Sequence, residues 1–145
     1  MSTDDLADRI AAAFDTDATP PERIVVHRCD ECARVSLDFA GRKWTELSPE
    51  VLAYHHDSIP LLSPEAFAYY LPACLLFAAK DPARIGEMLL YSLGPKADEW
   101  AAGRRAACNY SVEQLHLIIE AAEMIAAEDS DHFGRFLRRA RAYWA

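Results

Sequence analysis

The hydrophobic pattern of the chain is dominated by residues 66–79, in which two tyrosine hydroxyls are the only polar side-chain groups. A helix without a solvated face lies buried in a soluble protein. Ser63 is a good N-cap, and Pro64 suits the first helical position, because its missing N–H would have no partner there. With its first turn the stretch has about 16 residues, fewer than the ~20 that cross a bilayer. The pattern predicts a buried central helix over about residues 63–80.

Pro72 lies well inside this predicted helix. A proline in a helix interior has no N–H to donate, and its ring clashes with the carbonyl four residues earlier, which here is Ala68. We therefore expect a helix kinked at Pro72, with the bend between Ala68 and Tyr70.

Shorter stretches with apolar residues at helical spacing lie on both sides of the central helix. Their start signals are Ser2 or Thr3, Ser48-Pro49-Glu50, Asp81-Pro82, Ser111, and Ser130 or Asp131. The corresponding helices run to about Phe14, His55, Leu93, Ile125 and Trp144. Residues 96–109 are left undecided, because Gly103 weakens a helical pattern there. The chain thus predicts an all-α fold, a compact single-domain bundle of about six to eight helices over residues 1–145.

Residues 19–40 carry conflicting signals. Thr19-Pro20-Pro21-Glu22 resembles a capping box with proline just inside it, which predicts a helix. The β-branched Ile24-Val25-Val26 can instead form a short strand. The cap and the later apolar residues, Leu37 among them, favour a helix that ends near Gly41.

Composition narrows the choice of partners. The 145 residues are 52% hydrophobic and carry a net charge of −8, with a sequence pI near 5.0. Non-specific binding to nucleic acid or to anionic membranes relies on basic patches, so neither is expected. An acidic surface suits a basic protein partner, and it also serves solubility. The acidic N-terminus lacks the features of a secretory signal, so we expect a cytoplasmic protein.

The sharpest local cluster is His27-Arg28-Cys29-Asp30-Glu31-Cys32. Two thiolates in a Cys-x-x-Cys pair can share one zinc ion, and His27, His55 or His56 can complete a tetrahedral set. One such pair without a second is a weak signal. Ordinary thiols without a cofactor are therefore favoured over a zinc site, and a zinc site over a redox pair, because no strand–helix pattern surrounds the motif.

Other candidate residues have a simpler structural interpretation. The His55-His56-Asp57 trio is more often a polar helix end than a catalytic base, since no activated nucleophile can be paired with it. Tyr69, Tyr70 and Trp44 are more often core residues than pocket walls. The arginines can bind phosphate, but in so acidic a chain we expect them to pair with Asp and Glu; they are Arg104, Arg105, Arg138, Arg139 and Arg141. Phosphate loops, nucleophile elbows and His-Glu-x-x-His motifs are absent from the sequence.

Several motifs follow one another along the chain. They are Cys-Asp-Glu-Cys at 29–32, Trp44, His-His-Asp at 55–57, Leu-Ser-Pro-Glu-Ala-Phe-Ala-Tyr-Tyr-Leu-Pro-Ala at 62–73, and Ser-Val-Glu-Gln at 111–114. Together they resemble an uncharacterised family of small bacterial proteins, over roughly residues 10 to 143. The resemblance implies a bacterial source and a mostly helical domain, and it names no catalytic residue. The family often has Tyr where this chain has Cys74.

These observations favour a non-enzymatic protein-binding domain. The specific hypothesis is a cytosolic immunity protein that neutralises a basic bacterial toxin through electrostatic complementarity. The expected contact surface comprises Glu113, Glu120, Glu123 and Glu128. The alternatives are a zinc module or enzyme built around Cys29 and Cys32 with His27 and His55 or His56, and a structural subunit of an oligomer.

Overall fold

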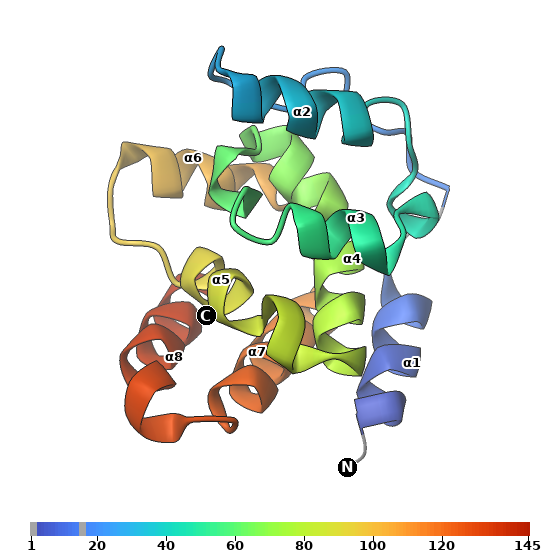
Figure 1. Cartoon of the computed structure of the whole chain (residues 1–145). Helices are drawn as coiled ribbons and strands as arrows, with labels where there is room; N and C mark the ends of the chain where they lie inside the picture. Colours follow the sequence, from blue (N-terminus) through green and yellow to red (C-terminus); the bar gives the residue numbers. More distant parts are fainter. Residues whose placement is uncertain (1–2, 15–16) are drawn as a thin grey trace.

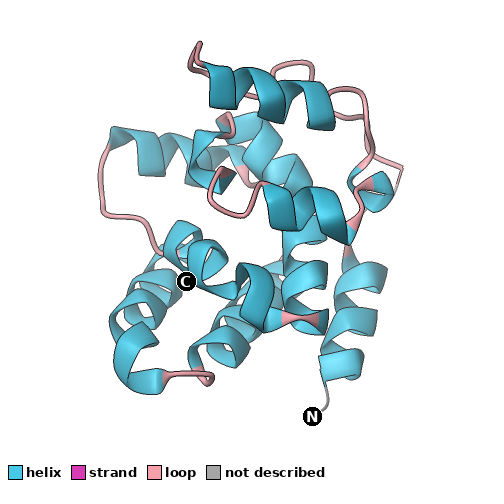
Figure 2. Ribbon diagram, viewed as in Figure 1, coloured by secondary structure: helices cyan, strands magenta, loops and turns pink. Residues whose placement is uncertain are grey.

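The computed structural model describes residues 3–14 and 17–145, which form mainly helices and the loops that join them (Figure 1). Within these residues there are eight α-helices, two 3₁₀ helices and no strand (Figure 2). The α-helices are α1 (Thr3–Ala13), α2 (Asp30–Phe39), α3 (Pro49–Tyr54), α4 (Pro64–Lys80), α5 (Pro82–Leu93), α6 (Glu99–Ala107), α7 (Val112–Ala126) and α8 (Ser130–Trp144). The 3₁₀ helices are η1 (Trp44–Glu46) and η2 (Ile59–Leu61). The predicted all-α, single-domain fold is confirmed.

Helix α4 is the central helix that the hydrophobic pattern predicts. It packs against α1, α5, α6 and α7, and most of its side chains are buried. Ser63 caps it as expected, because its Oγ accepts a hydrogen bond from the N–H of Ala66 at 3.0 Å. The same Oγ donates to the carbonyl of Arg23 at 2.7 Å. The cap thus also fixes a segment forty residues earlier against the start of α4.

Helix α4 continues through Pro72 without a break. Pro72 has no N–H to donate to the carbonyl of Ala68. That carbonyl instead accepts a hydrogen bond from the hydroxyl of Tyr110 at 2.5 Å. Burial raises the pKa of Tyr110 well above its ordinary value, so the hydroxyl stays protonated and able to donate. A side chain from before α7 therefore satisfies the acceptor that proline leaves, and the bend itself stays a prediction.

The prediction of a helix beginning at Thr19 is wrong for residues 20–29. The helix starts only at Asp30, and Val25 instead forms an isolated antiparallel bridge with Leu62. The N–H of Ser63 also donates to the carbonyl of Ile24 at 2.8 Å. β-branched residues favour extended backbone, and here a remote segment supplies its hydrogen bonds. Gly41 follows the end of α2 with a φ of +73°, a conformation that suits glycine.

Side-chain caps account for most of the remaining helix starts. Ser48 caps α3, and Ser111 forms a capping box with Gln114 at the start of α7. Asp98 caps α6, which resolves the undecided stretch 96–109 as a helix. Asp81 makes no capping bond to α5, contrary to expectation; its carboxylate lies 3.9 Å from Arg84 Nε instead. For α1, the predicted cap Ser2 lies outside the described residues and Thr3 is already helical.

The side chain of Arg104 is buried in the core, although it is charged. Only 1% of the residue is exposed, and its Cζ lies 3.9 Å from the ring centre of Phe67 and 3.8 Å from that of Trp100. Its Nη1 donates to the carbonyl of Ser92 at 3.4 Å, near the C-terminus of α5. Burial lowers the pKa of Arg104 to about 10. Two aromatic faces and a helix C-terminus thus stabilise this cation.

Of the three aromatic residues predicted to lie in the core, Tyr70 and Trp44 are buried and Tyr69 is half-buried. Tyr70 is fully buried and donates to the carbonyls of Phe39 and Arg42. Trp44 is buried as well.

Among the described residues no helix is long and apolar enough to span a bilayer.

Candidate functional site

The Cys-x-x-Cys motif lies at the start of α2. Cys29 is the N-cap of the helix, and its Sγ accepts a hydrogen bond from the N–H of Cys32 at 3.2 Å. Cys29 is exposed, whereas Cys32 is fully buried. Burial raises the pKa of the Cys32 thiol, and the contacts with Cys29 and Glu31 raise it further. The motif therefore combines one accessible thiol with one that resists ionisation.

The predicted histidine ligands do not complete a metal site with these sulfurs. No three His, Cys, Asp or Glu side chains lie together as metal ligands in residues 3–14 and 17–145. Nε2 of His55 donates to Oδ2 of Asp38 at 2.7 Å, and Nδ1 of His56 donates to the Ala53 carbonyl at 2.9 Å. His27 is exposed beside the motif. Zinc binding by Cys29 and Cys32 stays a prediction.

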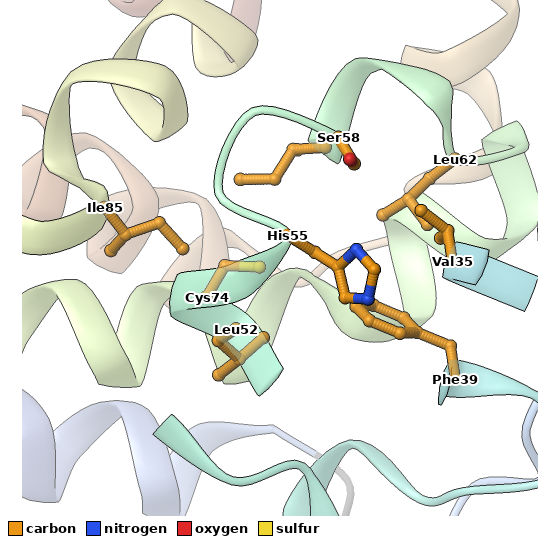
Figure 3. A pocket seen from close by; sticks show the side chains of 9 residues that line it. Val35, Phe39, Leu52, His55, Ser58, Leu62, Cys74 and Ile85 are labelled. Carbon is orange, nitrogen blue, oxygen red and sulfur yellow. The ribbon is translucent and has the colours of Figure 1, made fainter. Parts of the chain in front are cut away.

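A small cavity lies beside His55 (Figure 3). Its volume is about 10 Å³, room for about one water molecule. The rings of His55 and Phe39 meet edge to face on one side, with 5.5 Å between their centroids. Cys74 also lines the cavity, and burial raises the pKa of its thiol to about 12. The cavity is too small for a substrate, and its thiol stays protonated at neutral pH.

Three exposed side chains and the half-buried Asp38 lie together on the surface of α2 and α3. We call Arg34, Leu37, Asp38 and Tyr54 the α2–α3 face. Leu37 is 71% exposed and Tyr54 is 65% exposed. Cζ of Arg34 lies 5.8 Å from the ring centre of Tyr54, and its Nε lies 3.6 Å from the Asp38 carboxylate. An aromatic ring and an arginine in contact on a surface are typical of protein interfaces.

The sequence did not reveal this face, because Leu37 was used there only as evidence for a helix. The buried residues of α2 are Cys32, Val35 and Phe39. Leu37 follows Val35 by two positions, so it points to nearly the opposite side of the helix. Once the start of α2 is known, the helical period alone is enough to predict that Leu37 is exposed.

The four predicted partner-binding glutamates have different environments on and after α7. Oε1 and Oε2 of Glu120 accept hydrogen bonds from Arg9 of α1 at 3.1 and 2.5 Å, and these bonds lower the pKa of Glu120. Glu123 accepts a bond from Arg141 of α8 at 3.1 Å. Glu113 and Glu128 are exposed and form no ion pair with a described residue. Two of the four carboxylates thus connect helices, and two remain available to a partner.

Thiol labelling gives a direct test of the motif. We expect a disulfide reagent to modify Cys29 rapidly in the native protein, and all four cysteines only after unfolding. Cys32 is buried, and burial raises the pKa of Cys74 to about 12 and that of Cys108 to about 11. The measurement is the absorbance of the released thiol in stopped flow. Cys29→Ser should abolish the rapid phase.

The same sample tests for zinc. We expect less than about a tenth of an equivalent per chain in protein purified without an affinity tag. Stoichiometric zinc that is lost in Cys29→Ala, together with labelling that requires a chelator, would contradict this expectation and support the metal site.

Comparison with known proteins places the chain in a family but gives no activity. Residues 2–145 match a family of unknown function (DUF6714). No curated protein and no solved structure matches the chain. The match extends over almost the entire sequence and agrees with the resemblance to an uncharacterised family. The chain therefore belongs to the family of unknown function DUF6714.

Proposed function

We propose that this chain is a non-enzymatic protein-binding domain, and most specifically a cytosolic immunity protein that neutralises a basic toxin. The observation that carries the proposal is the α2–α3 face, where Tyr54 and Leu37 are exposed beside Arg34. Exposed tyrosine and arginine side chains are frequent anchors of protein interfaces. A partner that covered this face would remove apolar surface from water.

Charge supports a basic partner for this domain. The chain carries 23 acidic and 15 basic residues. Exposed carboxylates lie on the same two helices as the α2–α3 face, namely Asp30, Glu31 and Glu50. Glu113 and Glu128 are exposed elsewhere and add to the negative potential. Such a surface attracts a basic protein and speeds its association.

The test begins with a partner captured on the immobilised chain from the cells that encode it. For an immunity protein, the captured protein is basic, inhibits growth when expressed alone, and is neutralised when this chain is co-expressed. A captured protein that does not inhibit growth, or growth that co-expression does not restore, would contradict the proposal. Light scattering distinguishes an immunity protein from a structural subunit of an oligomer, since we expect the isolated chain to be a monomer at micromolar concentration.

Charge reversal then tests the electrostatic part of the proposal. We expect Glu113→Lys with Glu128→Lys to slow association about tenfold at low ionic strength, and less at high ionic strength. The matched control is the same change of charge at Glu22 and Glu65, which are exposed elsewhere. Tyr54→Ala should act mainly on the dissociation rate. Equal association rates for both double variants would show that Glu113 and Glu128 have no special role.

A further inference from the structure

A second surface feature is a hollow of about 490 Å³ between the turn after α5, helix α6 and the last turns of α8. Its charged lining residues are Lys96, Asp98, Arg105 and Arg139, and alanines and the ring of Tyr143 line much of the rest. Three of these residues are cationic and only Asp98 is acidic. Oδ1 of Asp98 already accepts a hydrogen bond from the N–H of Ala101 at 2.7 Å. The hollow is therefore positively charged in a chain whose net charge is −8.

The fold brings these cations together from separate parts of the chain. A Cβ on Gly94 would lie 2.8 Å from the backbone N of Ala140 and 2.9 Å from the Cβ of Arg139. This close approach sets Arg139 of α8 beside the turn that carries Lys96. Arg105 reaches the hollow from α6. Its guanidinium is fixed in place, because its Nε and Nη1 donate to the carbonyls of Tyr143 and Cys108 at 3.1 and 3.2 Å.

None of these three cations forms an ion pair with a described residue, contrary to the expectation from sequence that the arginines pair with acids. Arg141 does so, with Glu123. Arg104 is a fourth cation nearby, since it and Arg105 both act electrostatically on Tyr143, which lines the hollow. Like charges that face one space repel each other, and a bound anion would offset that repulsion.

We propose that this hollow binds a small molecule that carries a phosphate group, with Lys96, Arg105 and Arg139 around the phosphate oxygens. Arginine side chains match phosphate geometry with paired N–H groups, and lysine supplies a point charge. The volume is within the range of small-molecule sites. The alanine side chains and the ring of Tyr143 provide apolar walls for the rest of the molecule. The site is distinct from the α2–α3 face and does not depend on the proposed protein partner.

Calorimetry with inorganic pyrophosphate at constant ionic strength tests the site in the full chain. We expect saturable binding with one site per chain, weakened about tenfold or more by Arg139→Gln or by Lys96→Gln. The matched control is Arg138→Gln, the same change one position earlier on α8 at an exposed residue that does not line the hollow. It should bind within about twofold of the unaltered chain, because its charge is screened by water.

The binding measurements on the unaltered chain and its variants decide whether the phosphate site exists. No binding at millimolar pyrophosphate, or equal weakening by Arg139→Gln and Arg138→Gln, would overturn the proposal. If Arg139→Gln disturbs the contact with Gly94 and unfolds the protein, Lys96→Gln decides alone, since Lys96 is exposed in the connection between α5 and α6. A phosphate monoester with an apolar body, such as phenyl phosphate, should bind more tightly than inorganic phosphate, whereas equal affinity would exclude the apolar walls from recognition.

Discussion

Replacement of Trp144 by alanine is expected to lower the free energy of unfolding by about 3–5 kcal/mol. The residue is only 1% exposed, although it is the second-last of the chain. Its Nε1 donates to the carbonyl of Leu93 at 2.8 Å, and its ring packs edge to face on Tyr143 with 5.0 Å between centroids. The variant loses this packing and leaves a cavity between α8 and the end of α5. Urea unfolding followed by far-ultraviolet circular dichroism measures the effect.

Trp144→Phe separates the packing of the indole ring from its hydrogen bond to Leu93. The smaller ring keeps part of the packing but leaves the carbonyl of Leu93 without its donor, which costs about 1–3 kcal/mol. We therefore expect an intermediate stability for this variant. A loss below about 1 kcal/mol for Trp144→Ala would show that α8 is held by its other contacts and that Trp144 is not an anchor.

Gly94→Ala is expected to destabilise the protein by about 1–3 kcal/mol. The added methyl group would lie 2.8 Å from the backbone N of Ala140 and from the carbonyl O of Phe136. Both are backbone atoms of α8, so no side-chain rotation can relieve the overlap. Helix α8 must shift away from the turn instead, and the shift shows as a lower midpoint of thermal unfolding.

Gly103→Ala is the matched control, because a Cβ at Gly103 meets no atom within 4 Å. Gly103 lies inside α6, where alanine is favoured over glycine by about 1 kcal/mol. The two substitutions should therefore change stability in opposite directions. A Gly94→Ala variant as stable as the unaltered chain would mean that α8 can move without cost.

Local signals in the sequence were sufficient for most helix positions. Ser48, Ser63 and Ser111 each cap the helix that they predict. A capping hydroxyl acts within three residues of its own position, so the information is contained in a short window. The central helix was equally clear, since burial on all sides requires apolar residues on all sides.

Features that depend on remote contacts could not be predicted in this way. The segment around Val25 is extended because Leu62 and Ser63 pair with it, and nothing near Val25 in the sequence reveals these partners. The candidate sites show the same limit. Arg105 and Arg139 lie 34 positions apart and line one hollow only because α8 packs closely on Gly94. Charge counts predicted ion pairs for these arginines, but a count carries no information about proximity.

The carbonyl of Ala68 makes two distant positions depend on each other. It has Tyr110 as its donor because residue 72 is a proline. In an ancestor with any other residue at 72, the backbone N–H of that residue would have donated to the Ala68 carbonyl. A hydrogen bond from a hydroxyl at 110 would then have stabilised the fold much less. Conversely, a chain that keeps Pro72 and loses Tyr110 leaves this partly buried carbonyl without its donor. Natural selection should therefore retain the two residues together, so that Pro72 and Tyr110 are inherited as a pair although 37 residues separate them.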